Sequence, residues 1–545
     1  MPSSIESPDW STLGESSPGE PRPVLIAGEW RAARAIDTFT ATNPKTGRPI
    51  PGVFPVSAWP DLELALRAAS NAAAMLRALP DVADRLARFL EDYAVRIEAN
   101  ASEIIAAAAE ETGLALSPRL GDIELLRTTD QLRQASRAAR DCDWQRPTID
   151  TKAGLRSCLA PVGPVLVMGP NNFPLAFNGI SGGDFAAAIA AGNPVIAKAH
   201  PLHPNTSRLL AEAAHRSATA AGLPPGTVQM VYHTAVSDGL RMVRDERLAA
   251  VAFTGGRPTG LKLKAEAESA GTQFFGELSS INPTVLLPGA LEQHFETIVD
   301  QFVASVLMGT GQFCTKPGLV LLTAGEQTEC FIRAVANKLA AAPAGVLFSA
   351  AGLESLAGAV RTWIAAGAQP LTGGSVVDGD GFRFQNTLVR ATAKQFLGNP
   401  KTLQTEAFGN AAMVVVAAHH AQLLDMIRTL EGSLTGTIYS AINGADDDAY
   451  ASTATALRPK VGRLINDKMP TGVAVSPAMN HGGPFPASTQ PHFSAVGLPG
   501  SISRFTQLQS YDNVRDHRLP PCLRDRNPTG RLPRLINGEW SVGNL

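Results

Sequence analysis

Apolar residues recur along the chain with two spacings that predict different elements. Helical spacing, with arginine and glutamate on the outer face, predicts alanine-rich helices at residues 61–79, 82–111 and 121–140. Short continuous apolar runs predict strands at residues 165–168, 194–199, 227–232 and 248–253. Small-residue helical segments separate these runs, and this alternation predicts a mostly parallel, doubly wound sheet.

A second series of the same kind begins near Asn282. Its apolar runs predict strands at residues 284–287, 319–322, 412–417, 436–439 and 463–465. Two such series predict an α/β fold with two lobes. The length of 545 residues agrees, because single hydrophobic cores seldom grow so large.

Three segments lie outside these series. Residues 1–23 are rich in Ser, Pro and Glu and lack the basic and apolar parts of a signal peptide, so we expect a disordered tail. Residues 141–164 alternate charged and β-prone residues, which suggests an extended hairpin that leaves the body of the fold. Residues 501–545 are irregular in sequence pattern. Their LINGEW at 535–540 nearly copies LIAGEW at 25–30. The two stretches are either similar strand-turn elements or alike by chance.

Composition narrows the classes of partner. The formal net charge of −2, with no basic patch, gives no reason to expect a nucleic-acid partner. No uninterrupted apolar stretch is long enough to span a bilayer, so we expect no membrane partner. The five cysteines are scattered and lack metal-site spacing, so we expect no metal site and a reducing, cytoplasmic compartment.

One cysteine stands in a setting that suits chemistry. Cys314 lies between two glycine-bearing turns in GQFCTKPG at residues 311–318, just after an apolar helical run. A cysteine at a helix end can meet backbone N–H groups, which favour the nucleophilic thiolate. Alone, such a cysteine is more often a buried structural residue. Three other stretches change that interpretation: PNNFP at 170–174, FGELSSINP at 275–283 and EAFG at 406–409.

Taken in order, the four stretches resemble the motifs of the aldehyde dehydrogenase superfamily, and the resemblance extends from about residue 25 to about residue 529. It implies an aldehyde dehydrogenase-like α/β fold of two doubly wound, mostly parallel lobes plus an oligomerisation arm. It also implies a homodimer or homotetramer. The expected parts are a cofactor-binding domain at 24–140 and 165–282, a catalytic domain at 283–500, and an arm with C-terminal tail at 141–164 and 501–545.

The resemblance implies NAD(P)-dependent oxidation of a small-molecule aldehyde to a carboxylic acid. Cys314 would form a thiohemiacetal and then a thioester. Asn172 would donate its amide to the oxyanion, beside the backbone N–H of Cys314. Glu277 would activate the water that cleaves the thioester. Ser279 and Ser280 replace the two glycines that usually follow this glutamate.

The cofactor contacts follow from the same resemblance. FTGGRPTG at residues 253–260 joins an apolar strand to a helical run, which lets backbone N–H groups approach a phosphate. It resembles the family's Phe-Thr-Gly-Ser turn. Pro201 stands where NAD-preferring members often have a ribose-binding glutamate, so we expect NADP or NAD, with a slight preference for NADP. The expected cofactor-binding residues are Lys198, Pro201, Gly255, Gly256, Gly260, Glu406 and Phe408.

Finer detail is similar to a branch that contains 2-oxoglutarate semialdehyde (2,5-dioxopentanoate) dehydrogenases and an NADP-dependent fatty aldehyde dehydrogenase. That likeness rests on NFPLAF at 172–177, KAHPLHP at 198–204 and the stretch around Cys314. It implies 2-oxoglutarate semialdehyde as the substrate, with a fatty or aromatic aldehyde as the alternative. His481, beside two glycines, is interpreted as a loop residue at the substrate mouth rather than as a catalytic histidine.

The expected substrate tunnel is mostly apolar, which suits a dicarboxylate-like substrate poorly, and no arginine can be assigned to a carboxylate. Its expected lining residues are Phe177, Ile180, Phe313, Thr315 and Phe485. Two rival functions stay open. One is a CoA-acylating dehydrogenase, in which CoA rather than water takes the acyl group, and the other is a catalytically silent, cofactor-binding structural protein.

Overall fold

The structure, a computed structural model, describes residues 19–545. Its first lobe contains a seven-stranded sheet with the order β14-β13-β9-β10-β11-β1-β2. The strands from β14 to β11 are parallel, and the hairpin β1-β2 adds an antiparallel edge. The strands are β1 (Val24–Ile26), β2 (Glu29–Arg31), β9 (Val165–Met168), β10 (Val195–Lys198), β11 (Val228–Val231), β13 (Ala250–Thr254) and β14 (Gln273–Glu277).

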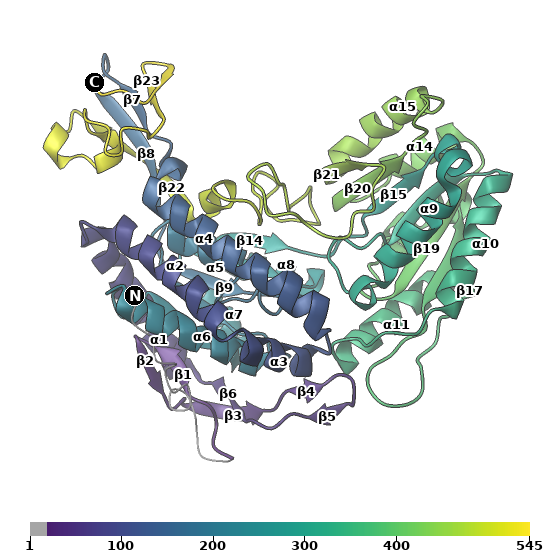
Figure 1. Ribbon diagram of the computed structural model, residues 1–545, viewed down its shortest axis with the longest axis horizontal. Helices are drawn as coiled ribbons and strands as arrows, with labels where there is room; N and C mark the ends of the chain where they lie inside the picture. Colours follow the sequence, from purple (N-terminus) through teal and green to yellow (C-terminus); the bar gives the residue numbers. More distant parts are fainter. Residues whose placement is uncertain (1–18) are drawn as a thin grey trace, which may run out of the picture.

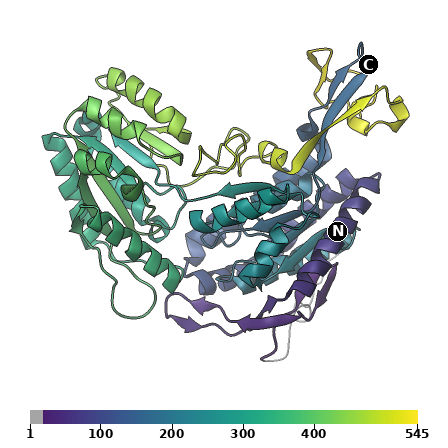
Figure 2. The same ribbon diagram turned by 180° about the vertical axis from the view of Figure 1, so that it is seen from behind.

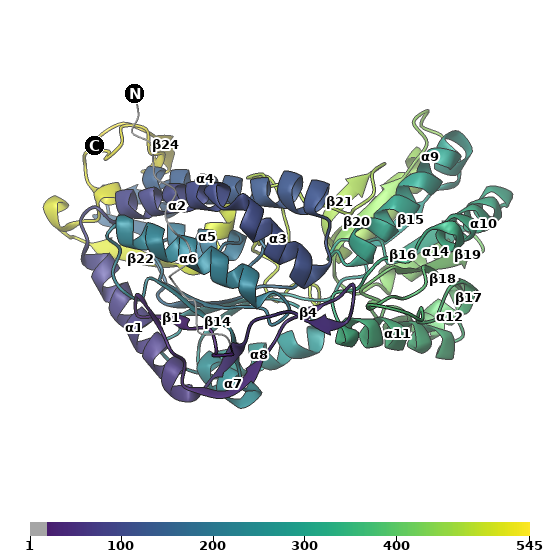
Figure 3. The same cartoon turned by 60° about the horizontal axis from the view of Figure 1, so that its bottom comes forward.

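Helices cover both faces of this sheet (Figure 3). One face carries α2 (Val82–Ala99), α3 (Ala101–Thr112), α4 (Leu126–Asp141), α5 (Gly183–Ala190) and α6 (Pro204–Ala220). The other face carries α1 (Trp59–Ala78), α7 (Val236–Val243) and α8 (Arg257–Ser269). Many alanines of the alanine-rich helices are buried here, and their small side chains let helices approach one another closely. A π-helical turn, η2 (Leu116–Leu125), joins α3 to α4.

The second lobe has its own seven-stranded sheet, with the order β17-β18-β19-β16-β15-β20-β21 and one antiparallel edge at β17. Its two faces form two separate hydrophobic cores. The strands are β15 (Pro283–Leu286), β16 (Leu319–Thr323), β17 (Gln369–Thr372), β18 (Thr387–Thr392), β19 (Ala411–Ala417), β20 (Ser433–Tyr439) and β21 (Val461–Asn466). Its helices are α9 (Pro288–Leu307), α10 (Glu326–Ala341), α11 (Ala350–Ala365), α12 (Ala393–Gly398), α13 (Pro400–Leu403), α14 (His420–Arg428) and α15 (Asp447–Leu457).

A third, five-stranded sheet projects from the first lobe (Figures 1 and 2). Its order is β22-β8-β7-β23-β24. The hairpin suggested for residues 141–164 is present as β7 (Thr148–Asp150) and β8 (Leu155–Pro161), and the C-terminal segment supplies β22 (Thr506–Asp512), β23 (Arg534–Ile536) and β24 (Glu539–Ser541). The C-terminal segment is therefore less irregular than its composition suggests.

The repeated LI-x-GEW sequence forms the same local element twice. β1-β2 and β23-β24 are both antiparallel hairpins, and their two-residue turns have positive φ at Ala27-Gly28 and at Asn537-Gly538. Positive φ at both central residues gives a turn whose twist suits paired strands. The echo is thus a pair of similar strand-turn elements.

The remaining strands lie beside the first lobe: β3 (Ala35–Phe39), β6 (Phe54–Ser57) and β12 (His233–Thr234) form one small sheet, and β4 (Thr42–Asn43) pairs with β5 (Arg48–Pro49). The tail predicted at residues 1–23 lies mostly outside the described residues. Within its last five residues, Arg22 N–H donates to Val53 O at 2.8 Å, so regular pairing begins before β1.

A long segment without helix or strand, residues 467–499, runs from β21 back to the first lobe and is called the return segment below (Figure 1). It attaches to the end of β14, where Leu278 N–H donates to Ala487 O at 2.7 Å. Because β14 ends at Glu277, the return segment lies against the residue that the sequence singled out as a base.

Candidate active site

Cys314 follows α9 and a short turn, Met308–Gly311, on the second lobe. Gly309, Thr310 and Gly311 all have positive φ, so the chain reverses sharply before the cysteine. A Cβ on Gly311 would lie 2.1 Å from the carbonyl oxygen of Gly409, so only glycine permits this approach. The turn thereby packs the cysteine loop against the loop that contains Glu406.

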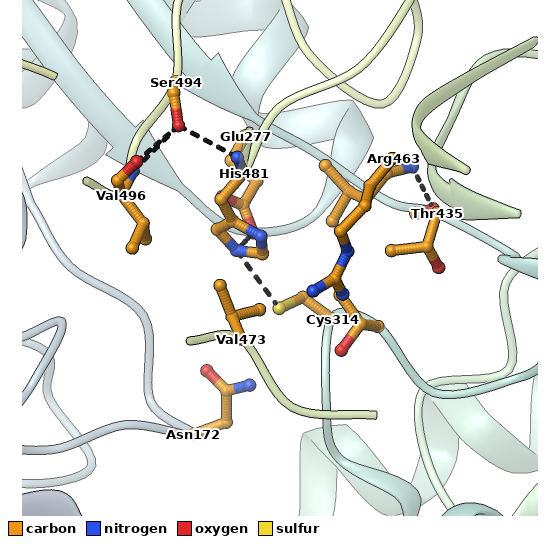
Figure 4. A network of polar contacts seen from close by, with 12 residues as sticks. Asn172, Glu277, Cys314, Thr435, Arg463, Val473, His481, Ser494 and Val496 are labelled. Atoms are coloured by element: carbon orange, nitrogen blue, oxygen red, sulfur yellow. Dashed lines mark hydrogen bonds and ion pairs between the residues drawn. The ribbon is translucent and has the colours of Figure 1, made fainter. Parts of the chain in front are cut away.

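Three candidate reacting groups meet at this point (Figure 4). His481 Nε2 lies 3.6 Å from Cys314 Sγ and 3.0 Å from Glu277 Oε1. The side chains of His481 and Glu277 are 2% and 6% exposed. Glu277 Oε2 is buried with no hydrogen-bond partner among the described residues, so it keeps a free acceptor inside the site. A nucleophile, an imidazole and a carboxylate thus come from the second lobe, the return segment and the first lobe.

The return segment holds His481 by its backbone. His481 N–H donates to Ser494 Oγ at 2.9 Å, and Ala495 N–H donates to the carbonyl oxygen of His481 at 2.8 Å. Ser494 Oγ in turn donates to Val496 O at 2.6 Å. Because these bonds fix the backbone, the imidazole keeps its position between the thiol and the carboxylate.

Burial raises the pKa of the Cys314 thiol well above its usual value, and the neighbouring Glu277 carboxylate raises it further. Both effects disfavour a second negative charge in a dry site. The positive charge of Arg127 acts in the opposite direction, with a smaller effect. Cys314 is therefore a neutral thiol at rest, and its activation requires a base.

Asn172 lies in the loop after β9 and is buried. Its Nδ2 donates one hydrogen to Gln312 O at 2.9 Å, two residues before the cysteine. The backbone carbonyl oxygen of Asn172 accepts from Arg119 Nη2 at 2.9 Å, which also holds the loop in place. The second hydrogen of Nδ2 can then serve an oxygen bound beside Cys314 (Figure 4).

A cavity of about 650 Å³ opens between the two lobes beside these residues. Its walls are mostly apolar and aromatic, with two arginines among them. Lining residues include Leu114, Arg119, Arg127, Phe173, Met308, Phe313 and Val473. Phe173 packs edge-on against both Phe177 and Phe313, at centroid distances of 5.2 and 5.3 Å.

The structure does not bring all five expected tunnel residues to this cavity. Phe313 lines it, and Phe177 stands behind it against His481. Ile180 is fully buried in the core of the first lobe. Thr315 is also fully buried, and its hydroxyl accepts from Gly472 N–H at 3.2 Å. Phe485 is 58% exposed at the molecular surface. The sequence of a loop does not show which of its side chains face a cavity and which are buried or exposed. The expected tunnel residues therefore included some that do not line the cavity.

The glycine turn before α8 fits a phosphate. Gly256 is the residue before the helix, and a Cβ added there would meet no atom within 4 Å, so space is open in front of the helix start. Gly260 has a different role, because a Cβ there would lie 2.2 Å from the side chain of Leu278. Gly255 N–H donates to Glu277 O at 3.1 Å, which joins this turn to the end of β14. The residues present therefore suit the pyrophosphate of a dinucleotide.

Lys198 ends β10 at the same edge of the sheet. Burial lowers its pKa to about 8, and it has no ion-pair partner among residues 19–545. His200 and His233 lie within electrostatic range, and burial lowers the pKa of His233 to about 4. Pro201 follows, partly buried. Because the histidines are neutral near pH 7, Lys198 is the cation of this corner, and no carboxylate of residues 19–545 pairs with it. A lone cation of this kind suits an anionic group of a cofactor.

Glu406 stands at the other end of the cofactor surface. Its Oε1 accepts from Ser280 N–H at 3.3 Å, and burial raises the pKa of the carboxyl. Phe408, two residues on, is partly buried. The buried Nζ of Lys316 donates to the carbonyls of Ala407, Gly409 and Ala411 at 2.7, 3.1 and 2.6 Å, and so fastens this loop.

Two polar side chains beside the motifs hold their loops in place. Ser280, at one of the two positions that usually hold glycine, donates from Oγ to Asn282 Oδ1 at 2.8 Å and accepts from Leu434 N–H at 2.9 Å, so the serine ties the end of β14 to the second lobe. Asn410, just after the EAFG stretch, donates from Nδ2 to Phe384 O and Asn386 Oδ1 at 2.8 and 2.7 Å. These hydrogen bonds hold the end of the loop that contains Glu406.

Ligand atoms of Glu277, Cys314 and His481 all lie within 4.8 Å of one another. A soft divalent ion could be held by such a set. The same three atoms also have the arrangement that nucleophilic catalysis needs, and the surrounding dinucleotide features favour that use.

The profile of the aldehyde dehydrogenase family matches residues 30–483. The chain belongs to the aldehyde dehydrogenase family. An alpha-ketoglutaric semialdehyde dehydrogenase 2 from Azospirillum brasilense is 36% identical over 533 residues, which cover 94% of this chain and 98% of that protein. An alpha-ketoglutaric semialdehyde dehydrogenase from Acinetobacter baylyi is 34% identical over 527 residues, with the same coverage of both chains.

Solved structures of the family share the fold. An aldehyde dehydrogenase from Bacillus cereus superposes with a TM-score of 0.78 at 20% identity, over 91% of this chain and 97% of that chain. Lactaldehyde dehydrogenase from Escherichia coli gives 0.77 at 23% identity, over 90% and 98%. These structures confirm the predicted two-lobed α/β fold. The family match and the two relatives confirm the prediction of an NAD(P)-dependent aldehyde dehydrogenase. In residues 19–545 no helix combines the length and apolarity that a membrane span requires.

The sequence does not reveal three residues whose surroundings are formed by segments that lie far apart along the chain. The sequence predicts His481 as a loop residue at the substrate mouth; it lies in a loop, but its imidazole is buried against Cys314 and Glu277. Lys316 has no predicted role, although a lysine in an apolar stretch signals a buried cation that needs acceptors. The pattern predicts Arg127 as part of an amphipathic helix, and nothing in the local sequence separates it from its exposed neighbours.

Proposed function

We propose that this aldehyde dehydrogenase oxidises 2-oxoglutarate semialdehyde to 2-oxoglutarate, with NADP or NAD as the oxidant, through a thioester on Cys314. The contact of His481 with both Cys314 and Glu277 carries the mechanism, because it supplies an acceptor for the thiol proton and a base for water. The names of the two relatives at 36% and 34% identity support the substrate.

The first step is attack of Cys314 on the aldehyde carbon. The raised pKa of the thiol means that its proton must leave as the S–C bond forms. In the tautomer that carries its hydrogen on Nδ1, His481 Nε2 accepts this proton, and the Nε2–H of the resulting imidazolium then donates to Glu277 Oε1 at 3.0 Å. The oxygen of the aldehyde becomes an oxyanion, which Asn172 Nδ2 and the backbone N–H of Cys314 stabilise.

Bound NAD(P) supplies the chemistry of a hydride acceptor. On the protein side, the open space before α8 would take the pyrophosphate, Lys198 would bind the adenosine ribose, and Glu406 would bind the nicotinamide ribose. Lys316 keeps the Glu406 loop in place through three carbonyls. After oxidation, Cys314 carries the acyl group as a thioester.

Hydrolysis completes the cycle. Glu277 removes a proton from water, the hydroxide adds to the thioester carbonyl, and Asn172 again stabilises the oxyanion. Collapse of the tetrahedral intermediate breaks the S–C bond, so that the carboxylic acid leaves and the Cys314 thiolate recovers its proton from His481. Glu277 passes the proton that it took from water to solvent. The unpartnered Glu277 Oε2 is the acceptor that this water would use.

Three alternatives are open to a direct test. The aromatic rings of Phe173 and Phe313 in the cavity wall, with Phe177 packed behind them, also suit a fatty or aromatic aldehyde. A CoA-acylating reaction needs an acyl acceptor other than water, and a buried carboxylate next to the thiol counts against it. A silent cofactor-binding protein would not need the assembled nucleophile, base and oxyanion donor.

The test measures steady-state kcat/KM for 2-oxoglutarate semialdehyde, decanal and benzaldehyde, each with NADP and with NAD. Products are identified with and without CoA, and Cys314→Ala serves as the control for background oxidation. The proposal expects 2-oxoglutarate semialdehyde to have the highest kcat/KM and to give the free acid. Higher kcat/KM for decanal or benzaldehyde, faster formation of acyl-CoA, or activity that survives in Cys314→Ala would overturn it.

A further inference from the structure

Arg127 lines the substrate cavity and leaves part of its hydrogen-bonding capacity unused. It lies on α4, is partly buried, and forms no ion pair with any carboxylate of residues 19–545. Only Nη1 is engaged, donating to Val473 O at 2.9 Å. Nε and Nη2 are buried and have no hydrogen-bond partner among the described residues. A buried guanidinium with two unused donors is costly unless a ligand completes it.

The two unused donors lie on one edge of the guanidinium. Nε and Nη2 share the side of the planar group that faces away from the Cδ carbon. A carboxylate binds to this edge through two parallel hydrogen bonds. The ring of Phe177 lies 5.0 Å from the guanidinium carbon and that of Phe173 lies 5.7 Å from it, so aromatic packing fixes its plane. The geometry is that of a preformed carboxylate receptor.

The two neighbouring arginines already have hydrogen-bond partners within the protein. Arg119 lines the same cavity, but it forms an ion pair with the buried Glu124 and donates to Asn172 O at 2.9 Å. Arg463 donates to the carbonyls of Pro470 and Gly472, each at 3.2 Å, and so braces the return segment. Of these three, only Arg127 has both donors of the Nε–Nη2 edge without a partner among the described residues, and it lines the cavity.

Arg127 also lies within electrostatic range of the reacting thiol. Its charge lowers the pKa of Cys314, and the charges of Glu124, Cys314 and Glu277 act on the guanidinium in return. The apolar wall between them, formed by Phe173, Phe313 and Val473, suits the methylene groups of a short chain. A molecule with an aldehyde at one end and a carboxylate at the other therefore meets complementary groups at both ends.

We propose that Arg127 binds the carboxylate at the far end of the aldehyde substrate and thereby makes the enzyme selective for short aldehydes that carry this group. This inference rests on the proposed function, because it takes the aldehyde to be bound at Cys314. It also explains how a mostly apolar tunnel can accept a charged substrate, because the single cation of Arg127 would bind the carboxylate and no further polar lining is needed.

The test compares aldehydes matched in length, with and without a terminal carboxylate: 2-oxoglutarate semialdehyde against pentanal, and succinate semialdehyde against butanal. The variants are Arg127→Met, Arg127→Lys and, as a matched control, Arg137→Met. Arg137 lies on the same helix and is exposed. Arg127→Met should lower kcat/KM for the two carboxylated aldehydes by about 30-fold or more, mainly through KM, because a buried charge partner is lost.

For pentanal and butanal, Arg127→Met should change kcat/KM far less, and Arg137→Met should behave as the unmodified enzyme with all four substrates. Arg127→Lys keeps the charge without the two-donor edge, so it should recover part of the loss. An equal loss for charged and uncharged aldehydes would show a structural role and overturn the inference. An unmodified enzyme that oxidises pentanal as efficiently as 2-oxoglutarate semialdehyde would overturn it as well.

A binding measurement separates this inference from the proposed function. Glutarate, a five-carbon dicarboxylate that cannot be oxidised here, should protect Cys314 from iodoacetamide in the unmodified enzyme and in Arg137→Met, but not in Arg127→Met. Protection in all three would place the carboxylate elsewhere and overturn the inference. If no aldehyde is oxidised at all, the proposed function fails, whereas this protection assay still reports on Arg127.

Discussion

His481 Nε2 lies 3.0 Å from Glu277 Oε1, and this contact joins the return segment to the end of β14. The same nitrogen faces Cys314 Sγ at 3.6 Å, so the imidazole stands between the thiol and the carboxylate. In the proposed mechanism, two proton transfers, one from the thiol and one from water, therefore use neighbouring but different groups. Mutations at the two residues should affect different steps of the reaction.

Glu277→Gln should stop the reaction after hydride transfer. The amide keeps the size of the side chain but cannot accept a proton from water, and loss of a general base typically lowers a rate by about two to four orders of magnitude. A burst of NAD(P)H with little steady-state turnover is expected, with an acyl adduct on Cys314 detectable by mass spectrometry. Full steady-state turnover in this variant would exclude Glu277 as the base for water.

His481→Gln should instead slow the burst itself. The glutamine can hold a hydrogen bond to Glu277 but cannot take the thiol proton, so S–C bond formation becomes the slow step. Stopped-flow measurement of NAD(P)H in the first turnover would show a lower rate and no accumulated adduct. Ser494→Ala, which removes only the acceptor of the His481 backbone, is the control and should have a weaker effect. A normal burst in His481→Gln would return the histidine to a structural role.

The reactivity of Cys314 should depend on pH in a way that reports on Glu277. Burial and then the Glu277 charge raise the pKa of the thiol, so alkylation by iodoacetamide should be slow at neutral pH and accelerate as the pH rises. Glu277→Gln removes the negative charge, and the alkylation profile should move to lower pH. The measurement is the extent of modification at Cys314 by peptide mass spectrometry. An unchanged profile would mean that the carboxylate and the thiol do not interact.

The residue at position 201 should control the choice of cofactor. With Pro201 beside a basic corner, NADP should bind at least as well as NAD. Pro201→Glu adds a carboxylate that binds a ribose diol and repels a 2′-phosphate, an effect of about 1 kcal/mol or more for a partly buried contact. The ratio of kcat/KM for NADP to that for NAD should fall accordingly, with Pro201→Gln as the uncharged control. Strong preference for NAD in the unmodified enzyme would contradict this expectation.

Preference for NADP should also weaken above neutral pH. Burial lowers the pKa of Lys198 to about 8, so the free enzyme has a charged lysine below this pH and a neutral lysine above it. The 2′-phosphate gains more from the cation than a hydroxyl does, so KM for NADP should rise relative to KM for NAD between pH 7 and 9. Lys198→Arg stays charged throughout and should give a flat ratio. A flat ratio in the unmodified enzyme would show that Lys198 does not face the 2′-phosphate.

Short motifs revealed much of the candidate site because the groups involved lie next to turns and strand ends that have their own sequence pattern. Cys314 between glycines, Lys198 at the end of a strand and the glycines before α8 could all be located in this way. Their local geometry is determined over a few residues, by φ values that glycine permits and by helix starts. The resemblance to a family then supplied roles for them.

His481, Arg127 and Lys316 could not be found in this way. A histidine beside glycines has the same local sequence whether or not its ring meets a thiol, and an arginine on an amphipathic helix looks the same with or without an ion-pair partner. Their environment is created by segments from both lobes and the return segment that meet only in the folded chain. Burial and the absence of a partner are properties of that assembly.

The two hairpins with the sequence LI-x-GEW show which features the local sequence determines and which only the tertiary structure determines. The sequence by itself determined the hairpin twice, because the two turn residues adopt positive φ and reverse the chain locally. It did not determine the partner of either hairpin: β1 pairs antiparallel with β11 in the first lobe, whereas β23 pairs parallel with β7 in the projecting sheet. Nearly the same six residues present the same backbone donors and acceptors, and only the tertiary structure decides which sheet edge lies within reach to receive them.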